Sequence, residues 1–217
     1  MIPRKIHQIF IQFKNGKPFN DIPLFVQQVS KTKQYCITND IEYQMWNEES
    51  CNELIGKYPQ FKELYENFRE PIQQVDFIRY LILYDTGGIY VDCDIAPIGD
   101  MNDLFEMNEF FVIWNNDKKL LPYNAILGST PKNILYEDIF KQIEHDYVEK
   151  SNIDVYKTWI GRFVFQTTGH FMLKRVLKRY PDIQLLDILK IHNKAGEIIS
   201  GVCPIFEDYN LSTWFNN

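Results

Sequence analysis

The 217-residue chain has few cysteines, no long apolar run and no excess of positive charge, and each absence excludes a class of protein. Its four cysteines are scattered without a Cys-x-x-Cys pair, so we expect reduced, partly buried thiols and no zinc centre. No segment approaches the roughly 18–20 consecutive apolar residues of a transmembrane helix, and the first residues lack the apolar core of a signal peptide. A formal net charge of −6 argues against a general nucleic-acid-binding protein. We therefore expect a cytoplasmic protein with no transmembrane segment and no nucleic-acid partner.

Several common catalytic motifs are also missing from the sequence. It contains no P-loop, no G-x-G-x-x-G fingerprint and no Ser/His/Asp arrangement. There is no internal repeat and no Pro/Gly-rich linker. The composition is 45% hydrophobic and 15% aromatic, which is typical of a folded chain with a sizeable core. A single domain spanning residues 1–217 is the simplest expectation.

Strand-like and helix-like segments alternate along the chain, which predicts an α/β fold. Strands are predicted at residues 5–11, 34–38, 43–46, 110–114, 123–127 and 183–189. Helices are predicted at residues 23–30, after an Asn47 cap, at 58–68 and 132–149, and from Gly169 to before Pro181.

Residues 71–94 carry the strongest signal, because an apolar helix runs through Gly87-Gly88 into a short strand with two aspartates. The glycine pair can adopt the positive φ with which a chain leaves a helix sharply. Alternation along a strand then predicts that Tyr90, Asp92 and Asp94 share one face. Two carboxylates on one face of an apolar strand repel and desolvate each other unless a cation offsets their charge. A hard divalent metal that also holds a diphosphate would do so, which points to an enzyme with a nucleotide-activated donor.

Asp76 and Arg79 lie three residues apart on the preceding helix and therefore share a face. One interpretation is an exposed intrahelical ion pair, which contributes only a few tenths of a kcal/mol. The other is a functional pair, since the helix leads directly into the strand with Asp92 and Asp94. In that case both polar faces meet in one crevice.

The pattern D-x-x-R-Y-x-x-L-Y-x-x-G-G-I-Y-x-D-x-D at residues 76–94 resembles the D-x-D sugar-transferase family. That family includes fungal α-mannosyltransferases, bacterial capsular-polysaccharide transferases and viral relatives, and the glucosylating bacterial toxins are similar over the same block. Residues 2–10 also resemble the family's first strand, with Phe10 where a tryptophan is usual.

The resemblance implies a GT-A type fold with a central mixed, mostly parallel sheet flanked by helices. It implies a metal-dependent, retaining hexosyltransferase that uses Mn²⁺ or Mg²⁺. The donor would be a nucleotide-sugar, with a UDP-hexose favoured and GDP-mannose as an alternative. The acceptor would be a glycan, as in polysaccharide biosynthesis.

The resemblance also assigns roles to the motif residues. Asp94 would be the direct metal ligand, and Asp92 would contact the metal and the donor. Asp76 and Arg79 would hold donor sugar hydroxyls. The donor pocket would also be lined by Ile9, Phe10 and Tyr90.

The end of the chain contributes further candidates. Ser212-Thr-Trp214 resembles the Ser-x-Trp of the toxin catalytic domains, where a flap closes over the diphosphate, although Trp214 could equally pack on the core. The toxins' acidic ligand would fall on Tyr209, so a second metal ligand is expected at Asp208 or Asn210, with His192 as a more distant option.

Three further features have two interpretations each. Asn124 either approaches the reacting centre, as a similar block of the family suggests, or stabilises a turn. His7 is more often a satisfied core histidine than a base. The basic run at residues 174–179 is a solvated helix face or a contact for an anionic membrane or acidic acceptor.

Two other functions remain open at this point. One is a sugar- or nucleotide-binding module that keeps the fold without turnover. The other is a D-x-D phosphatase, which requires its aspartate nucleophile after the first strand.

Overall fold

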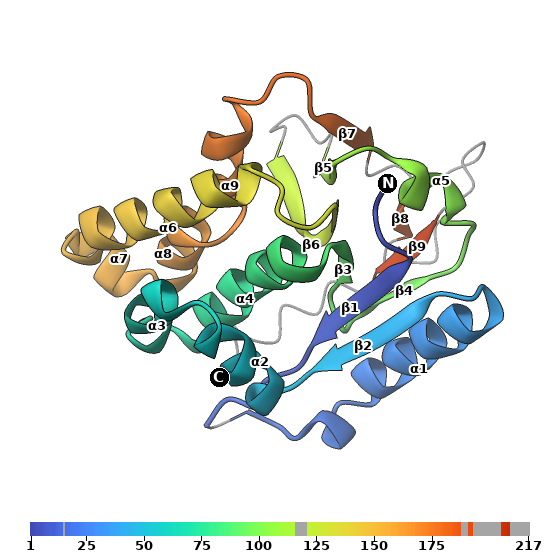
Figure 1. Cartoon of the computed structure of the whole chain (residues 1–217). Helices are drawn as coiled ribbons and strands as arrows, with labels where there is room; N and C mark the ends of the chain where they lie inside the picture. The colour runs from blue at the N-terminus through green and yellow to red at the C-terminus, as the bar shows by residue number, and fades with distance from the viewer. Residues whose placement is uncertain (15, 116–120, 188–190, 193–204, 209–217) are drawn as a thin grey trace.

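The computed structural model describes residues 1–14, 16–115, 121–187, 191–192 and 205–208, which form two β-sheets with helices around them (Figure 1). The strands are β1 (Lys5–Ile9), β2 (Glu42–Trp46), β3 (Gly88–Val91), β4 (Ile95–Pro97), β5 (Phe110–Asn115), β6 (Leu121–Ser129), β7 (Gln184–Asp187), β8 (Ile191–His192) and β9 (Phe206–Asp208). The helices are η1 (Phe19–Asp21), α1 (Pro23–Thr38), α2 (Glu48–Gly56), α3 (Pro59–Glu66), α4 (Pro71–Thr86), α5 (Asn102–Glu106), α6 (Leu135–Ser151), α7 (Asp154–Thr158), α8 (Ile160–Thr167) and α9 (His170–Leu177).

The larger sheet has the strand order β2-β1-β3-β6-β5-β7. Strand β6 pairs antiparallel with β3 and β5, whereas the β1–β2, β1–β3 and β5–β7 pairs are parallel. The smaller sheet has the order β4-β9-β8. The prediction of a mixed, mostly parallel central sheet is thus confirmed.

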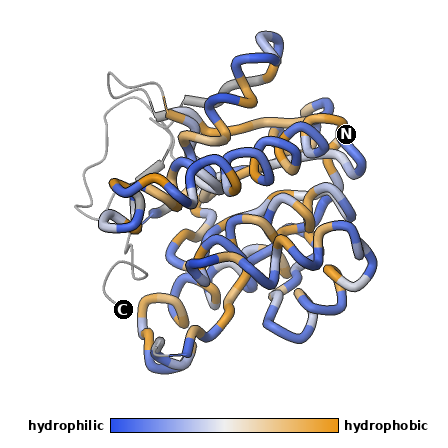
Figure 2. The backbone as a smooth tube through the Cα atoms, turned by 90° about the vertical axis from the view of Figure 1, so that its left-hand side faces the viewer, coloured by the Kyte–Doolittle hydropathy of each residue, from blue (hydrophilic) through white to orange (hydrophobic). Residues whose placement is uncertain are grey.

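Alternating side chains of the central strands enter two separate cores. On β5, Phe110 and Val112 join the cluster beneath α2, α3, α4, α6 and α9, whereas Phe111 and Ile113 join the cluster beneath α1 and α5. Hydrophobic and hydrophilic residues alternate along several of the helices in Figure 2, which is the pattern of helices with one face on a sheet. None of the helices in the described part of the chain combines the length and apolar character needed to cross a bilayer.

Helix α4 is the central helix, and its residues from Val75 to Leu83 are all buried. It begins at Pro71, behind a capping box in which the Gln73 side chain accepts from the Glu70 backbone N–H. It ends at Gly87, whose φ is +67° and which is followed by Gly88 at +101°. A Cβ at Gly87 would lie 2.7 Å from Pro131 Cδ, and one at Gly88 would lie 2.7 Å from the Lys5 carbonyl. The predicted sharp exit at this glycine pair is therefore confirmed, and only glycine fits there.

One predicted strand is wrong, because residues 34–38 form the last part of α1. Gln28, Thr32 and Cys36 recur at a spacing of four residues and are buried against the sheet. Packing of this face overrides the low helix propensity of Tyr, Cys, Ile and Thr. The predicted Asn47 cap is confirmed, since its side chain accepts from the Ser50 backbone N–H at 2.9 Å.

His7 on β1 is a satisfied core histidine, as one of its two interpretations predicted. It is fully buried, its Nδ1 accepts from Trp46 Nε1 at 3.1 Å, and its Nε2 donates to the Gly87 carbonyl at 2.9 Å. The pKa of His7 is lowered from 6.5 to about 4, because the effect of burial exceeds the opposite effect of the Gly87 hydrogen bond. The ring is therefore neutral at neutral pH and connects β1 with the exit of α4.

We expect His7 to make the protein less stable in mild acid. The unfolded chain binds a proton on this ring below about pH 6.5 and the folded chain only near pH 4, so stability is complete above pH 6.5 and falls as the pH drops toward 4. The loss approaches about 3 kcal/mol at pH 4, at about 1.4 kcal/mol per unit of pKa. Urea unfolding at pH 7.5 and 5 measures it, and the difference between the two pH values should shrink in His7→Gln. An unchanged difference would show that other groups, such as His170, cause the acid sensitivity.

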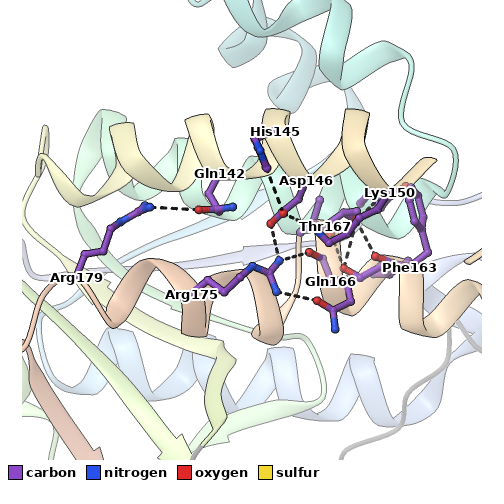
Figure 3. Close-up of polar contacts among 12 residues, drawn as sticks. Gln142, His145, Asp146, Lys150, Phe163, Gln166, Thr167, Arg175 and Arg179 are labelled. Atoms are coloured by element: carbon purple, nitrogen blue, oxygen red, sulfur yellow. Dashed lines mark hydrogen bonds and ion pairs between the residues drawn. The ribbon is translucent and has the colours of Figure 1, made fainter. Parts of the chain in front are cut away.

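An ionic cluster around the buried Asp146 joins helices α6, α8 and α9 (Figure 3). Asp146 is almost fully buried and pairs with Lys150 on its own helix. Its Oδ2 also lies 2.5 Å from Arg175 Nη2 on α9. Arg175 also donates to the side chain of Gln166 on α8 at 2.7 Å. In the basic run, Arg175 and Arg179 therefore make tertiary contacts, the latter with Gln142 at 3.2 Å, instead of forming a purely solvated face.

Candidate functional site

A cavity of about 750 Å³ lies where β1 and β3 end, at the edge of the sheet where parallel strands of α/β proteins bind ligands. Residues from several parts of the chain reach it: Ile9, Phe10, Phe13, Lys17, Phe25, Asp76, Arg79, Tyr90, Asp92, Cys93, Asp94, Tyr123, Asn124, Val164, Phe165 and His170. The predicted site residues on the helix and on the strand therefore meet at one cavity.

Asp76 and Arg79 form a buried ion pair, with 2.9 Å between Asp76 Oδ1 and Arg79 Nη2. Both side chains are about 5% exposed, so the interpretation as an exposed surface pair is wrong. Arg79 also lies 3.4 Å from Asp92 Oδ1 and 4.8 Å from the centre of the Tyr90 ring, and Tyr90 donates a hydrogen bond to Asp92. Burial raises the pKa of Asp76, and the guanidinium opposes that rise. Arg79 thus connects the polar face of α4 with the carboxylates after β3.

Asn124 belongs to this cluster and does not stabilise a turn. Its side-chain amide donates to Asp76 Oδ1 at 3.2 Å, and its backbone carbonyl accepts from Arg79 Nη1 at 2.8 Å. The register of β5 with β6 changes from Val112↔Leu127 to Ile113↔Tyr123, so residues 124–126 have no counterparts on β5. Such a bulge re-aims side chains beside a site, and here it accompanies an Asn124 that contacts α4.

Thr168 is a further residue of the candidate site, and no motif in the sequence indicates it. Its hydroxyl donates to Asp76 Oδ2 at 2.8 Å, and its carbonyl accepts from Tyr80 on α4 at 3.0 Å. The Asp76 carboxylate is therefore held from α4, β6 and the α8–α9 junction. No local signal in the sequence pairs residues 76 and 168.

The two aspartates of the D-x-D motif lie in a turn and not on a strand, which corrects the predicted alternation. Strand β3 ends at Val91, and the Ile95 N–H donates to the Asp92 carbonyl at 3.1 Å. Alternation along a strand would place Cys93 on the face opposite to Asp92 and Asp94, yet all three residues line the same cavity. At this turn the chain leaves the larger sheet, since the next strand, β4, belongs to the smaller sheet.

Gln8 on β1 fixes the position of this turn. Its side chain is fully buried and donates to the carbonyls of Asp92 at 3.1 Å and Ile95 at 3.4 Å. The Tyr43 hydroxyl in turn donates to Gln8 Oε1 at 2.9 Å. The backbone of the carboxylate turn is therefore anchored by β1 and β2.

Asp208 approaches the same place from β9, because its backbone pairs with Ile95, the residue after Asp94. Its side chain is buried and accepts a hydrogen bond from Tyr123. Burial and the charges of Asp208, Asp92 and Asp94 all raise the pKa of Tyr123, so three carboxylates act on one phenol.

The carboxylates around Tyr123 suit a hard divalent cation. Within the described ranges no group of three or more His, Cys, Asp or Glu side chains is arranged to hold a metal ion by itself. Mg²⁺ typically binds one or two carboxylates together with substrate phosphates and water, and Asp92 and Asp94 provide such a pair. Asp208 lies close enough to add to the negative field, whereas Asn210, Ser212 and Trp214 lie outside the described residues. His192 lies on β8, paired in register with Glu207 of β9.

Aromatic rings form another part of the cavity wall. Phe10 contacts Phe19 and Phe25 edge-on, with ring centres 5.2 and 6.1 Å apart. Elsewhere in the lining, His170 packs on Phe165 with ring centres 4.4 Å apart, and burial lowers the pKa of His170 to about 4. The cavity therefore combines an apolar region near Ile9 and Phe10 with a charged region near Arg79.

Comparison with known proteins places these features in context. Residues 25–111 match the model of a glycosyltransferase sugar-binding region containing a DXD motif. The chain is 31% identical over 223 residues to an uncharacterized glycosyltransferase of Acanthamoeba polyphaga mimivirus, covering 97% of this chain and 77% of the relative. It is 30% identical to a mannosyl phosphorylinositol ceramide synthase of Saccharomyces cerevisiae over 83% of this chain, but spans only 43% of that relative.

Solved structures show the same fold at low sequence identity. A glycosyltransferase involved in the glycosylation of the major capsid of PBCV-1 matches with a TM-score of 0.55 and 9% identity, over 97% of this chain and 95% of that one. The PaToxG glycosyltransferase matches with a TM-score of 0.54 and 17% identity, over 83% and 70%. These neighbours confirm the predicted GT-A type fold.

Proposed function

Because the chain belongs to the glycosyltransferases whose sugar-binding region contains a DXD motif, we propose that it transfers a hexose from a nucleotide-sugar to an acceptor bound beside the cavity. The observation that carries this proposal is the buried Arg79 between Asp76 and Asp92, on the wall of a cavity that Asp94 also lines. Helix α4, the turn after β3 and strand β6 supply polar groups of this wall. Such an arrangement orients a polar ligand more precisely than an isolated surface ion pair could.

Each side chain has a distinct role in this proposal. Asp76, Arg79 and Asn124 hold hydroxyls of the donor sugar, since they offer acceptors and donors at one rigid place. The aromatic region at Phe10 binds the nucleotide base of the donor. Asp92 and Asp94, with Asp208 behind them, would hold Mn²⁺ or Mg²⁺, which neutralises negative charge on the departing diphosphate. In the retaining transfer that we propose, the acceptor attacks from the side of the departing phosphate, which takes the acceptor's proton, so no side-chain base is needed.

Two lines of support bear on the donor and the acceptor. The sequence resemblance favours a UDP-hexose and a glycan acceptor in polysaccharide biosynthesis. Mannosyltransferases among the relatives favour GDP-mannose and an inositol phosphoceramide as second candidates. Buried free thiols at Cys36, Cys51 and Cys93 support a reducing, cytoplasmic compartment.

The phosphatase alternative loses support in the structure. That chemistry requires an aspartate after the first strand, and here β1 is followed by Phe10 and Ile11. The D-x-D pair instead follows β3, the third strand along the chain.

We expect one nucleotide-sugar to raise the melting temperature only when Mn²⁺ is present. A ligand at 100 times its Kd stabilises the folded state by about 2.7 kcal/mol. UDP-glucose, UDP-galactose, UDP-N-acetylglucosamine and GDP-mannose are each tested with and without the metal. Binding followed by slow release of free sugar would support an enzyme, and binding without any turnover toward glycan or lipid acceptors would support a binding module. A protein that responds to none of the four donors would contradict the proposal.

A further inference from the structure

Exposed hydrophobic side chains are concentrated at one end of the molecule. The described residues include nine large exposed hydrophobic side chains, and five of them fall within residues 148–160. These five form what we call the α7 surface: Val148, Ile153, Val155, Trp159 and Ile160. They lie at the end of α6, on and beside α7 and at the start of α8, three helices that contact one another (Figure 1). Single exposed apolar residues are ordinary, but a group of this kind marks an interaction site.

The same part of the chain carries an excess of positive charge, whereas the protein as a whole is negatively charged. Residues 148–180 contain seven Lys and Arg but only two Asp and Glu, which leaves 16 basic and 27 acidic residues in the rest. Two acidic residues just outside this range offset part of the excess, since Asp146 pairs with Lys150 and Arg175 and Asp138 lies 3.7 Å from Arg179. The remaining charge is still positive, in a chain whose net charge is −6. The partner of this region should therefore be anionic.

We propose that the α7 surface binds the headgroup region of an anionic lipid bilayer. Trp159 is 57% exposed, and tryptophan is the side chain most typical of a membrane–water interface. The Arg162 guanidinium lies 5.7 Å from the centre of the Trp159 ring, which places a cation beside the apolar group. Apolar side chains that enter the interface and basic ones that meet anionic headgroups are the two components of peripheral membrane binding.

Helix α8 connects this surface with the cavity. It begins at Ile160 on the α7 surface, and its Val164 and Phe165 line the cavity. A protein bound through this surface therefore holds its cavity close to the membrane. The binding itself does not depend on sugar transfer, so it can be tested apart from the proposed function.

Sedimentation with vesicles tests this proposal. We expect the full chain to bind phosphatidylcholine vesicles that contain phosphatidylserine, to bind pure phosphatidylcholine vesicles much more weakly, and to be released by high salt. Replacing both Trp159→Ser and Ile160→Ser should weaken binding at least about tenfold, because two side chains no longer enter the interface. Ile153→Ser with Val155→Ser gives a second variant, on α7 and just before it.

A matched control replaces exposed apolar residues elsewhere. Ile37→Ser with Ile134→Ser removes two side chains that are more exposed than those replaced in the α7 surface and lie far from α7 in the sequence, and it should leave vesicle binding unchanged. Melting temperatures, with and without the nucleotide-sugar, show that each variant is folded and keeps its cavity. The proposal is overturned if the unchanged chain does not bind anionic vesicles, or if both α7-surface variants bind them as strongly as the unchanged chain does. It is also overturned if those variants only convert a dimer to a monomer, because the surface would then join two copies of the chain.

Discussion

Replacing Asp94 by asparagine should lower the rate of sugar transfer at least about 100-fold while leaving the protein folded. The change keeps the shape of the side chain and removes one of the two charges that face the cavity from the turn after β3. Loss of one preorganised electrostatic contact to a charged transition state typically costs a factor of 100 to 1,000 in rate. Stability should not fall, since Asp92 and Asp94 repel each other when no cation is bound.

Steady-state rates over a Mn²⁺ titration measure this effect. The metal concentration for half-maximal rate should rise in Asp94→Asn, which separates a metal ligand from a residue that only contacts the sugar. Asp103→Asn, on an exposed aspartate of α5, changes the net charge equally and should behave like the unchanged protein. If Asp94→Asn is fully active and has normal metal dependence, Asp94 is not a metal ligand.

Arg79→Met should destabilise the protein by about 3–5 kcal/mol, because it leaves the Asp76 carboxylate buried without a counter-charge. For a chain of this size that loss lowers the melting temperature by roughly 10 °C. Adding Asp76→Asn should restore more than half of the lost stability, since the uncompensated charge disappears. Neither variant should bind the nucleotide-sugar. Thermal unfolding and donor titration of both variants give the comparison.

The double variant distinguishes the two interpretations of this pair. If Asp76 and Arg79 only stabilise the fold, the double variant recovers donor binding together with stability. If they hold the donor, the double variant recovers stability but not donor binding. Lys62→Met, in the exposed Lys62–Glu66 pair of α3, provides the matched control and should cost less than about 1 kcal/mol.

The parts of the site that the sequence predicted are those that depend on short stretches of chain. Gly87-Gly88 could be predicted because positive φ is a local property, and the helix positions of Asp76 and Arg79 followed from their spacing. The burial of that pair could not be predicted, since it depends on Asn124 and Thr168, 48 and 92 residues further along the chain.

Errors arose where tertiary packing overrode a local pattern. Residues 34–38 have strand-like composition, but Thr32 and Cys36 pack as one helical face. The D-x-D aspartates have strand-like neighbours, yet β3 ends at Val91 because the chain turns toward the smaller sheet. In both cases the deciding contacts come from elements that the local sequence does not reveal.

The hydrogen bonds from Gln8 to the D-x-D turn have a consequence for how the chain folds. They join residues 84 positions apart, through a parallel pairing of β1 with β3 that no tight turn can close. Chains dominated by such distant contacts fold slowly, since loop-closure entropy is lost before the contacts form. We therefore expect the carboxylate turn to acquire its final shape only when the middle of the sheet has assembled, so that the geometry of the proposed donor site forms late in folding.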